Sequence, residues 1–379
     1  MDGRVKSAVA GGRFATLCQI PGWITIGVSC TAPVGAQENL KQAVGGLRCE
    51  VVQTADGLRD LRGRWHELET AAAQLNPFLT WDWQWSWWET FGSDYEPRCL
   101  LVLVGDTLIG LVPLCVARAE PHRLLFGGGL NLSDQLGFLH LPGQEVEVAG
   151  ATLDWAQGTP LDLHFLPQES APLLALKSAA EARGLTVVEH PEEVSPGLAL
   201  PGDFEAYLAA CLGKKDRHEL RRKFRRLDQE RPDWRMITQD DLGLEPALTA
   251  FLRLLQASGE HKQEFLTPEV RQFFTRISGR FQERGWLRIQ LLETQGEVLA
   301  GIYGFTVGGV WHLYNSGYDP NHGSLSPGLL CVAEGIRAAI EEGCTRADML
   351  RGNEPYKYRL GAADWPLQRL LVTSPAVSP

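Results

Sequence analysis

Hydrophobic and polar positions from residue 48 onward form two similar successions of helices and strands. Apolar residues at helical spacing alternate with short runs rich in Val, Leu, Ile and aromatic residues, which are typical of strands. We predict that the first succession contains, in chain order, a strand, two helices, three strands, a helix, a strand, a helix and a strand, at residues 49–53, 58–73, 81–91, 99–104, 108–117, 124–126, 145–157, 161–165, 169–183 and 185–189.

The second succession repeats this order closely. It is predicted to contain two helices, three strands, a helix and two strands, at residues 242–258, 268–284, 286–293, 298–307, 310–318, 329–342, 346–350 and 367–372. Turns at Gln295-Gly296 and Gly308-Gly309 suit antiparallel connections between its strands. We therefore expect a tandem α+β architecture with a mixed sheet in each half, and divide the chain into residues 48–200 and 204–375.

Residues 1–47 show no clean period and are rich in Gly, Ala and Ser. We interpret them as a disordered leader or as the result of a start codon placed too far upstream. A secretory signal is the alternative, because basic residues precede a modestly apolar stretch and small residues follow it. Pro21 and Gly22 interrupt that stretch.

Composition narrows the class of protein. The hydrophobic fraction of 44% and the charged fraction of 22% are typical of a soluble globular protein. The eight cysteines are scattered without metal-ligand spacing, so we expect reduced thiols, no metal and a cytoplasmic location. No apolar run is long enough to predict a membrane span. The net charge of −10 disfavours general coating of nucleic acid.

Residues 214–227 depart from this acidic background. Lys and Arg account for eight of the thirteen positions from Lys214 to Arg226. Leu220, Phe224 and Leu227 recur at helical spacing, so we predict a helix that docks by one apolar face. The basic remainder is either a solvated face between two halves or a surface for phosphates, an anionic substrate or tRNA.

A second informative segment runs from the predicted strand 310–318 into the predicted helix 329–342. Its loop contains Gly323, Ser324, Ser326 and Gly328. A Gly/Ser loop before a helix presents unpaired backbone N–H groups at the positive helix end, which suits an anion such as a pyrophosphate. The alternative is an ordinary strand-to-helix turn.

Three segments carry a resemblance to a known family: KKDRHELRRKFRRL at 214–227, YNSGYDPNHGSLSPGLL at 314–330 and DMLRGNEPYKYRLG at 348–361. They resemble the acyltransferase domain of the GNAT superfamily in its CelD/BioF-like version. Proteins of that group are similar to the FemAB peptidyltransferases, which have two GNAT-like halves. The resemblance covers residues 204–375, and it implies that both halves adopt a GNAT-like fold.

The resemblance also implies an activity. GNAT enzymes transfer an acyl group from acetyl-CoA or another acyl-CoA to an amine, and they bind the pyrophosphate at the loop that corresponds to 321–328. Arg351 and Lys357 are then further candidates for binding the co-substrate. HGSLSPG replaces the usual glycine-dense signature here, and Pro327 lacks a backbone donor.

For catalysis the resemblance and the residue types together indicate Asp348, Tyr356, His261 and Tyr318. Direct transfer requires a base for the amine, a donor for the oxyanion and a proton for the leaving thiolate. Each candidate has a structural alternative: a salt bridge to Arg351 or Lys357 for Asp348, and packing or loop structure for the others. No Ser-His-Asp spacing, nucleophile elbow or Walker motif is present.

We therefore predict an acyl-CoA-dependent N-acyltransferase. Its acceptor would be a small amine or an amine-bearing glycan, in cell-envelope or exopolysaccharide metabolism. The first alternative donor is aminoacyl-tRNA, as in FemAB relatives, with the basic helix binding the tRNA. The second alternative is a non-catalytic GNAT-like scaffold that binds an anionic ligand.

Five tryptophans lie in the predicted helix 81–91. Trp81, Trp85 and Trp88 share one face, which predicts core packing. Trp83 and Trp87 share another face and are expected to line a groove for a glycan or an acyl chain.

Overall fold

The computed structural model describes residues 46–375. These residues belong to the larger of two compact units of the chain, Ala36–Pro379. The predicted leader at 1–47 lies almost entirely outside the described residues. None of the helices in residues 46–375 combines the length and the apolarity that a membrane span needs.

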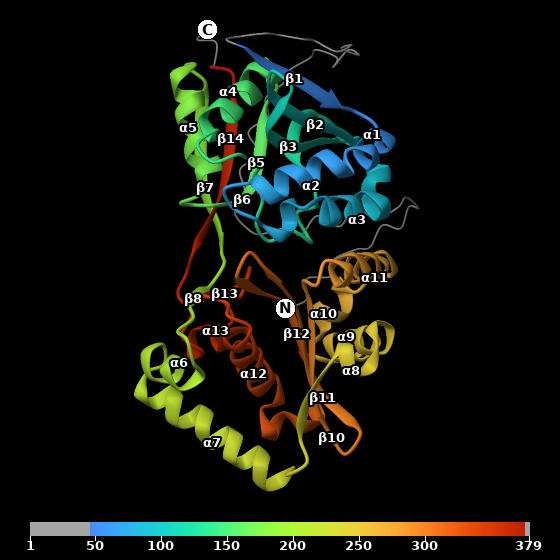
Figure 1. Cartoon of the computed structure of the whole chain (residues 1–379), viewed down its shortest axis with the longest axis vertical. Helices are drawn as coiled ribbons and strands as arrows, with labels where there is room; N and C mark the ends of the chain where they lie inside the picture. The colour runs from blue at the N-terminus through green and yellow to red at the C-terminus, as the bar shows by residue number, and fades with distance from the viewer. Residues whose placement is uncertain (1–45, 376–379) are drawn as a thin grey trace, which may run out of the picture. The chain divides into compact units, whose positions relative to one another are not determined.

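The first half is built around one mixed sheet (Figure 1). Its strands follow the order β1-β2-β3-β4-β6-β14-β7, with β5 paired to β3. All pairs are antiparallel except β4 with β6, which touch at a single register position, Leu124↔Leu161. The elements are β1 (Leu47–Val52), α1 (Ala55–Asp60), α2 (Arg62–Ala71), α3 (Trp81–Phe91), β2 (Tyr95–Val104), β3 (Thr107–Ala117), β4 (Glu120–Phe126), β5 (Leu139–His140), α4 (Glu145–Ala156), β6 (Leu161–Pro167), α5 (Ala171–Ala182) and β7 (Thr186–Val194).

The second half contains a second mixed sheet, in the order β8-β13-β12-β11-β10-β9. Only β12 and β13 are parallel. The elements are β8 (Gly197–Ala199), α6 (Phe204–Ala210), α7 (Lys214–Glu230), β9 (Arg235–Thr238), α8 (Gln239–Leu242), α9 (Leu244–Ala257), α10 (Glu260–Phe265), α11 (Pro268–Glu283), β10 (Leu287–Thr294), β11 (Glu297–Val307), β12 (Val310–Tyr318), the 3-10 helix η3 (Pro320–Leu325), α12 (Pro327–Glu341), β13 (Arg346–Asp348), α13 (Pro355–Arg359) and β14 (Pro366–Thr373).

These two mixed sheets with flanking helices confirm the predicted α+β class. Periodicity located the main elements well: Trp81–Phe91 and Val310–Tyr318 have the predicted bounds, and the basic helix continues from Lys214 to Glu230. Two strands pair across the expected boundary. β14, expected in the second half, lies in the first sheet between β6 and β7, while β8 completes the edge of the second sheet. The division at residues 200–204 itself stays a prediction.

The halves share a core that α3 and α11 form with aromatic side chains. Trp83 and Trp87 are 0% and 3% exposed, so the expectation that they line a groove is wrong. The Trp83 ring packs edge-on against Phe273 and Tyr314 of the second half. Both Trp side chains therefore lie in the contact between halves, where we expected an open surface.

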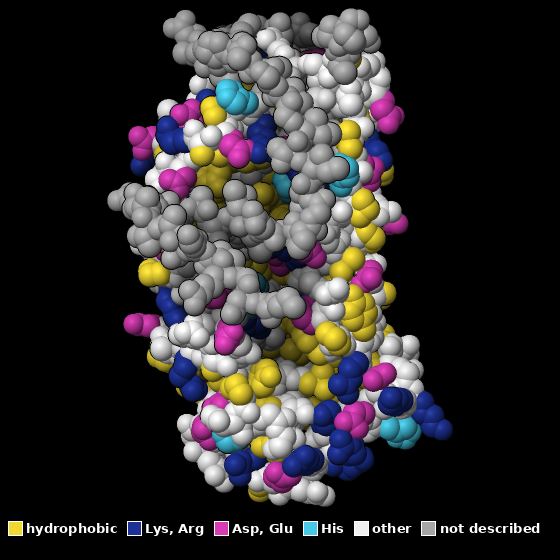
Figure 2. All heavy atoms as spheres, turned by 180° about the vertical axis from the view of Figure 1, so that it is seen from behind, with side chains coloured by type: hydrophobic (Ala, Val, Ile, Leu, Met, Phe, Trp, Pro, Cys, Tyr) yellow, Lys and Arg dark blue, Asp and Glu magenta, His cyan; other side chains and the backbone are white. Residues whose placement is uncertain are grey.

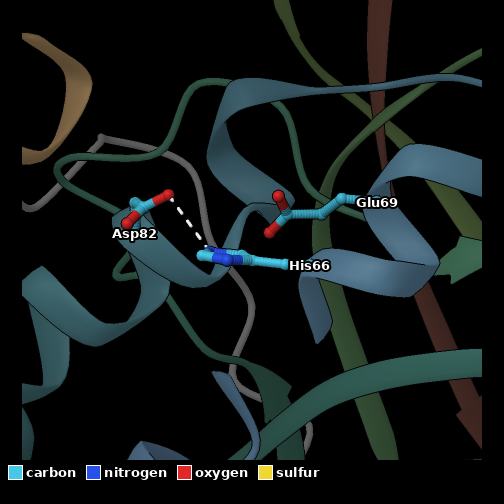
Figure 3. Close-up of side chains that lie close together, drawn as sticks. All are labelled: His66, Glu69 and Asp82. Carbon is cyan, nitrogen blue, oxygen red and sulfur yellow. Dashed lines mark ion pairs between the residues drawn. The ribbon is translucent and has the colours of Figure 1, made fainter. Parts of the chain in front are cut away.

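Polar side chains complete this contact at the start of α3 (Figure 3). Glu69 accepts a hydrogen bond from the Trp81 backbone N–H at 2.7 Å, and His66 Nε2 lies 3.4 Å from an Asp82 carboxylate oxygen. Arg284, which follows α11, donates to Glu69 at 2.9 Å and to Asp82 at 3.2 Å. The spacing of the His and the two carboxylates would suit a metal ion. Because the Arg284 guanidinium holds both carboxylates, we interpret the group as an ion-pair cluster that joins the halves.

Candidate functional site

The site begins where two parallel strands separate. β12 and β13 pair only at Val310↔Arg346, Trp311↔Ala347 and His312↔Asp348. β13 then ends, whereas β12 continues to Tyr318 (Figure 1). A register shift between β11 and β12 at Tyr303/Gly304 bends the strand at the same level. Beyond His312, one edge of β12 therefore has no strand partner within the described part of the chain, and its backbone groups are open to side chains or a ligand.

Ser316 lies on this open part of β12. Lys262 Nζ, from α10, donates to the Ser316 backbone carbonyl. The hydroxyl of Tyr356, from α13, lies near the Ser316 side chain, whose interaction lowers the Tyr356 pKa against the larger effect of burial. Burial raises the pKa of Tyr356 well above its usual range, so it stays a phenol that can donate a proton. Two proton-carrying groups thus converge on one residue at the strand opening.

The loop between β12 and α12 carries the predicted anion site. η3 occupies Pro320–Leu325, and Ser326 follows with φ +55°, a left-handed conformation that is unusual for a serine. The first α-helical backbone bond of α12 runs from Leu330 N–H to the Ser326 carbonyl at 3.2 Å. The amides of Gly328 and Leu329 precede it and have no helical acceptor. A Cβ added to Gly323 would meet nothing within 4 Å. The loop is therefore an open turn that ends in N–H groups without an acceptor among the residues that the structure describes.

The basic helix α7 meets this loop. Lys223 Nζ is hydrogen-bonded to the Ser326 hydroxyl and also lies 3.6 Å from a Glu219 carboxylate oxygen. Leu220 and Leu227 are buried, which confirms the predicted apolar face. A cation and a helix N-terminus thus lie at the same turn, the combination that favours a phosphate.

The rest of α7 is partly neutralised. Arg221, Arg222 and Arg226 form ion pairs with Glu205, Glu219 and Glu230. Lys214, Lys215 and Arg225 have no ion-pair partner among the described residues. Figure 2 shows Lys and Arg side chains gathered in the lower part of that view, with Asp and Glu among them. A groove of about 610 Å³ is lined by Lys215, Asp216, His218, Glu219, Arg222 and, from α13, Arg359.

Asp348 is held by the first half. Its carboxylate accepts hydrogen bonds from Ser195 Oγ at 2.7 Å, Gln135 Nε2 at 2.6 Å and the Leu350 backbone N–H at 2.9 Å. It is 5% exposed. A base needs a lone pair that faces the substrate, and these three donors engage both oxygens. The predicted base role is untested, and the geometry favours positioning of the strand end.

Arg351 and Lys357 are also engaged. Arg351 donates to the Leu130 carbonyl at 3.0 Å, lies 3.3 Å from an Asp134 oxygen and stacks over Phe165 at 4.2 Å. Lys357 is 3% exposed. Its ammonium contacts the carbonyls of residues 350–352 at 2.9–3.0 Å and the Glu354 carboxylate at 3.0 Å. Direct contact of either cation with a pyrophosphate would require the loss of these bonds.

The remaining predicted residues fall into two groups. Tyr318, 38% exposed, lies against the start of α12, where its ring is 3.2 Å from the Cβ position of Gly328. Ser324 is exposed on η3. His261 is exposed on α10 and, among residues 46–375, has no hydrogen bond or ion pair at the strand opening. The structure therefore brings together Tyr318, Ser326 and Gly328 at the loop and leaves His261 outside.

Three residues of the site were not among our candidates. Lys262 follows His261 directly, Glu354 lies two positions before Tyr356, and Lys223 lies inside the basic helix. Only Lys223 carried a usable signal, because the basic helix and the loop were both predicted to bind phosphate. Which residue of a charged run faces a cleft depends on the rotation of its helix, which a short segment such as 260–265 does not reveal.

The sequence agrees with a known family over the residues that form this site. Residues 214–358 match the sequence profile described as an acetyltransferase (GNAT) domain. This segment is therefore similar to a GNAT acetyltransferase domain. A comparison with curated proteins gave no match.

Solved structures extend the likeness to most of the chain. A crystal structure of FemX superimposes with a TM-score of 0.59 at 11% identity, over 82% of this chain and 95% of that chain. A conserved protein of unknown function from Bacteroides thetaiotaomicron VPI-5482 gives 0.52 at 12% identity, over 86% and 100%. A C-terminal domain (DUF2156) from Agrobacterium fabrum gives 0.54 at 9% identity, over 84% and 93%. At these identities the likeness shows the fold alone, and it extends over both sheets of the chain.

Proposed function

We propose that the second half is an acyl-CoA-dependent N-acyltransferase, with the donor's pyrophosphate at the turn before α12 and its thioester at Ser316. The observation that carries this proposal is the turn itself. The amides of Gly328 and Leu329 and the open space at Gly323 belong to one turn, and the Lys223 side chain is hydrogen-bonded to Ser326 within it. A diphosphate requires such a set of donors and positive charge.

The residues at the strand opening fit the chemistry of transfer. Tyr356 is positioned to protonate the leaving thiolate, because its phenol is the protonated form at neutral pH. The unpaired edge of β12 offers backbone groups to the donor's amides. The acyl-CoA would supply the activated acyl group. The acceptor is an amine, on a small molecule or a glycan, and we place the reaction in the cytoplasm and in cell-envelope or exopolysaccharide metabolism.

Aminoacyl-tRNA is the second candidate donor. Lys214, Lys215 and the groove toward Arg359 continue the positive charge of α7 away from the loop. A polyphosphate backbone would use this surface, whereas a single pyrophosphate needs only the turn. The FemX-like fold of the whole chain is compatible with either donor.

A binding measurement separates these proposals. We expect coenzyme A to bind the full chain at micromolar concentration and to raise its melting temperature. Gly328→Val places a branched side chain against Tyr318 and over the amides of the turn. Binding of coenzyme A should therefore weaken at least about tenfold, while the stability of the ligand-free protein changes little. Arg225→Ala is the matched control, since this exposed cation lies outside the turn.

The outcomes point in different directions. Equal affinity in wild type and Gly328→Val would remove the pyrophosphate from this turn. Salt-sensitive retention of tRNA without any effect of coenzyme A would favour the second donor. A folded protein that responds to neither ligand would leave a non-catalytic scaffold.

A further inference from the structure

Two lysines at the site have opposite surroundings. Lys357 Nζ has four acceptors within 3.0 Å, three backbone carbonyls and the Glu354 carboxylate. An ammonium has three N–H groups, so Lys357 is satisfied as a cation. Among residues 46–375, Lys262 Nζ has a single hydrogen-bond acceptor, the Ser316 carbonyl. As an ammonium, Lys262 would leave N–H groups without a protein acceptor in a half-buried position.

The neutral form of Lys262 fits its surroundings better. A neutral amine donates one N–H to Ser316 and keeps its lone pair free. Burial lowers the pKa of Lys262; the nearby Glu354 carboxylate opposes this effect and the Lys357 ammonium adds to it. Glu354 and Lys357 are thus the charged groups that act on the Lys262 amine, and they pair with each other at 3.0 Å.

The position of this amine matters because of what Ser316 is proposed to bind. Ser316 lies on the open edge of β12, where the thioester would lie beside Tyr356. A nucleophile held next to a reactive carbonyl gains from proximity. Lysines whose amine is desolvated next to another cation are known to become nucleophilic.

We propose that Lys262 is a site of self-acylation, at which the protein's own thioester donor modifies the amine and closes the acyl-transfer site. The inference rests on the proposed function. The neutral Nζ attacks the thioester carbonyl carbon, a C–N bond forms and the C–S bond breaks. The thiolate leaves and takes up the proton that Nζ loses. The product is an amide, which is stable, so the modification blocks the strand opening and is no intermediate of turnover.

The experiment uses the full chain and acetyl-CoA. Intact mass and peptide mapping are followed over time in wild type, Lys262→Arg and Gly328→Val. We expect one acetyl group on Lys262, with a rate that saturates with acetyl-CoA and is at least about tenfold above that of surface lysines. Lys214 and Lys215 are the internal surface controls, and Lys357 is the buried control. Coenzyme A should protect Lys262, and the acetylated protein should lose affinity for coenzyme A.

Thermal unfolding shows whether each variant folds, and acetic anhydride provides a donor-independent probe of the amine. Binding of coenzyme A with Lys262 acetylated no faster than Lys214 would overturn the inference and leave the proposed function standing. No binding of coenzyme A and no acetylation would overturn both. Rapid reaction of Lys262 with acetic anhydride but none with bound acetyl-CoA would show a reactive amine outside the thioester's reach, and that also contradicts the inference.

Discussion

The two halves treat the same turn in opposite ways. In each half a strand that is parallel to a later strand is followed by a glycine-containing loop: β4 leads through this loop and β5 to α4, and β12 leads through η3 to α12. In the first half the loop is filled: Cβ positions of Gly128 and Gly129 would lie 2.6 Å from Gln84 and 2.2 Å from Trp87. In the second half Gly323 has open space. The loop with more glycines, in the first half, is therefore closely packed, whereas the loop with fewer glycines, in the second half, is the open turn.

The filled loop also reaches the other half. The carbonyls of Leu130 and Leu132 accept hydrogen bonds from Arg351 and Tyr314, at 3.0 and 2.8 Å, and Gln135 donates to Asp348. The first half thus uses the loop to hold the strand ends that shape the site of the second half. We infer that the first half supports the site and binds no donor at its own turn.

The largest expected effect tests the filled loop. Gly129→Ala should destabilise the protein by about 3 kcal/mol, since a left-handed φ and a Cβ inside the Trp87 ring both oppose an alanine. Gly323→Ala should change the unfolding free energy by less than about 0.5 kcal/mol. Denaturant unfolding measures both. Similar losses in the two variants would remove the contrast between the loops.

A second prediction concerns the contact between halves at Glu69. Burial raises the pKa of Glu69 to about 7. The folded state then keeps a proton that the unfolded chain loses near its ordinary value, so stability falls as pH rises through this window. Relative to Glu69→Gln, wild type should lose about 2 kcal/mol between about pH 5 and pH 7.

The matched variant isolates this effect. Burial lowers the pKa of His66, which gives stability a slope of the opposite sign, but His66 is present in both proteins. The comparison therefore uses the difference between two denaturation series. Parallel pH profiles would mean that Arg284 keeps Glu69 ionised throughout.

Asp348 belongs to the second half, but its carboxylate is held by Gln135 and Ser195 of the first half. Asp348→Asn replaces one oxygen that accepts from Gln135 or Ser195 with a donor, and should cost about 1.5 kcal/mol of unfolding free energy. Ser195→Ala is the control for the loss of one bond. A role as base requires that turnover falls in the remaining folded protein while donor affinity stays the same. A loss of stability alone would make Asp348 a positioning residue.

Sequence periodicity was sufficient for most elements but not for their pairing. The strand at 366–373 has the same alternation whichever sheet it joins, and its place between β6 and β7 depends on contacts far apart in the chain. Trp83 and Trp87 show the same limit: their common face was evident, but the partner helix α11 that covers it was not. Of the site, the turn and the basic helix followed from local residues. The convergence of Lys262 and Tyr356 on Ser316 required the fold.

The smallest expected effect separates strain from binding at the open turn. The first loop places glycine at its left-handed positions, whereas the second places Ser326 there, at φ +55°. Ser326→Gly should raise the unfolding free energy by about 1 kcal/mol, because glycine adopts this conformation without a Cβ clash.

The same change removes the hydroxyl that holds Lys223. If the turn is a donor site, coenzyme A should bind the more stable variant less tightly, since a freer lysine must be ordered on binding. Ser324→Gly, exposed on η3, controls for added backbone freedom. A gain in stability with unchanged affinity for coenzyme A would show that Ser326 has no role in binding the donor.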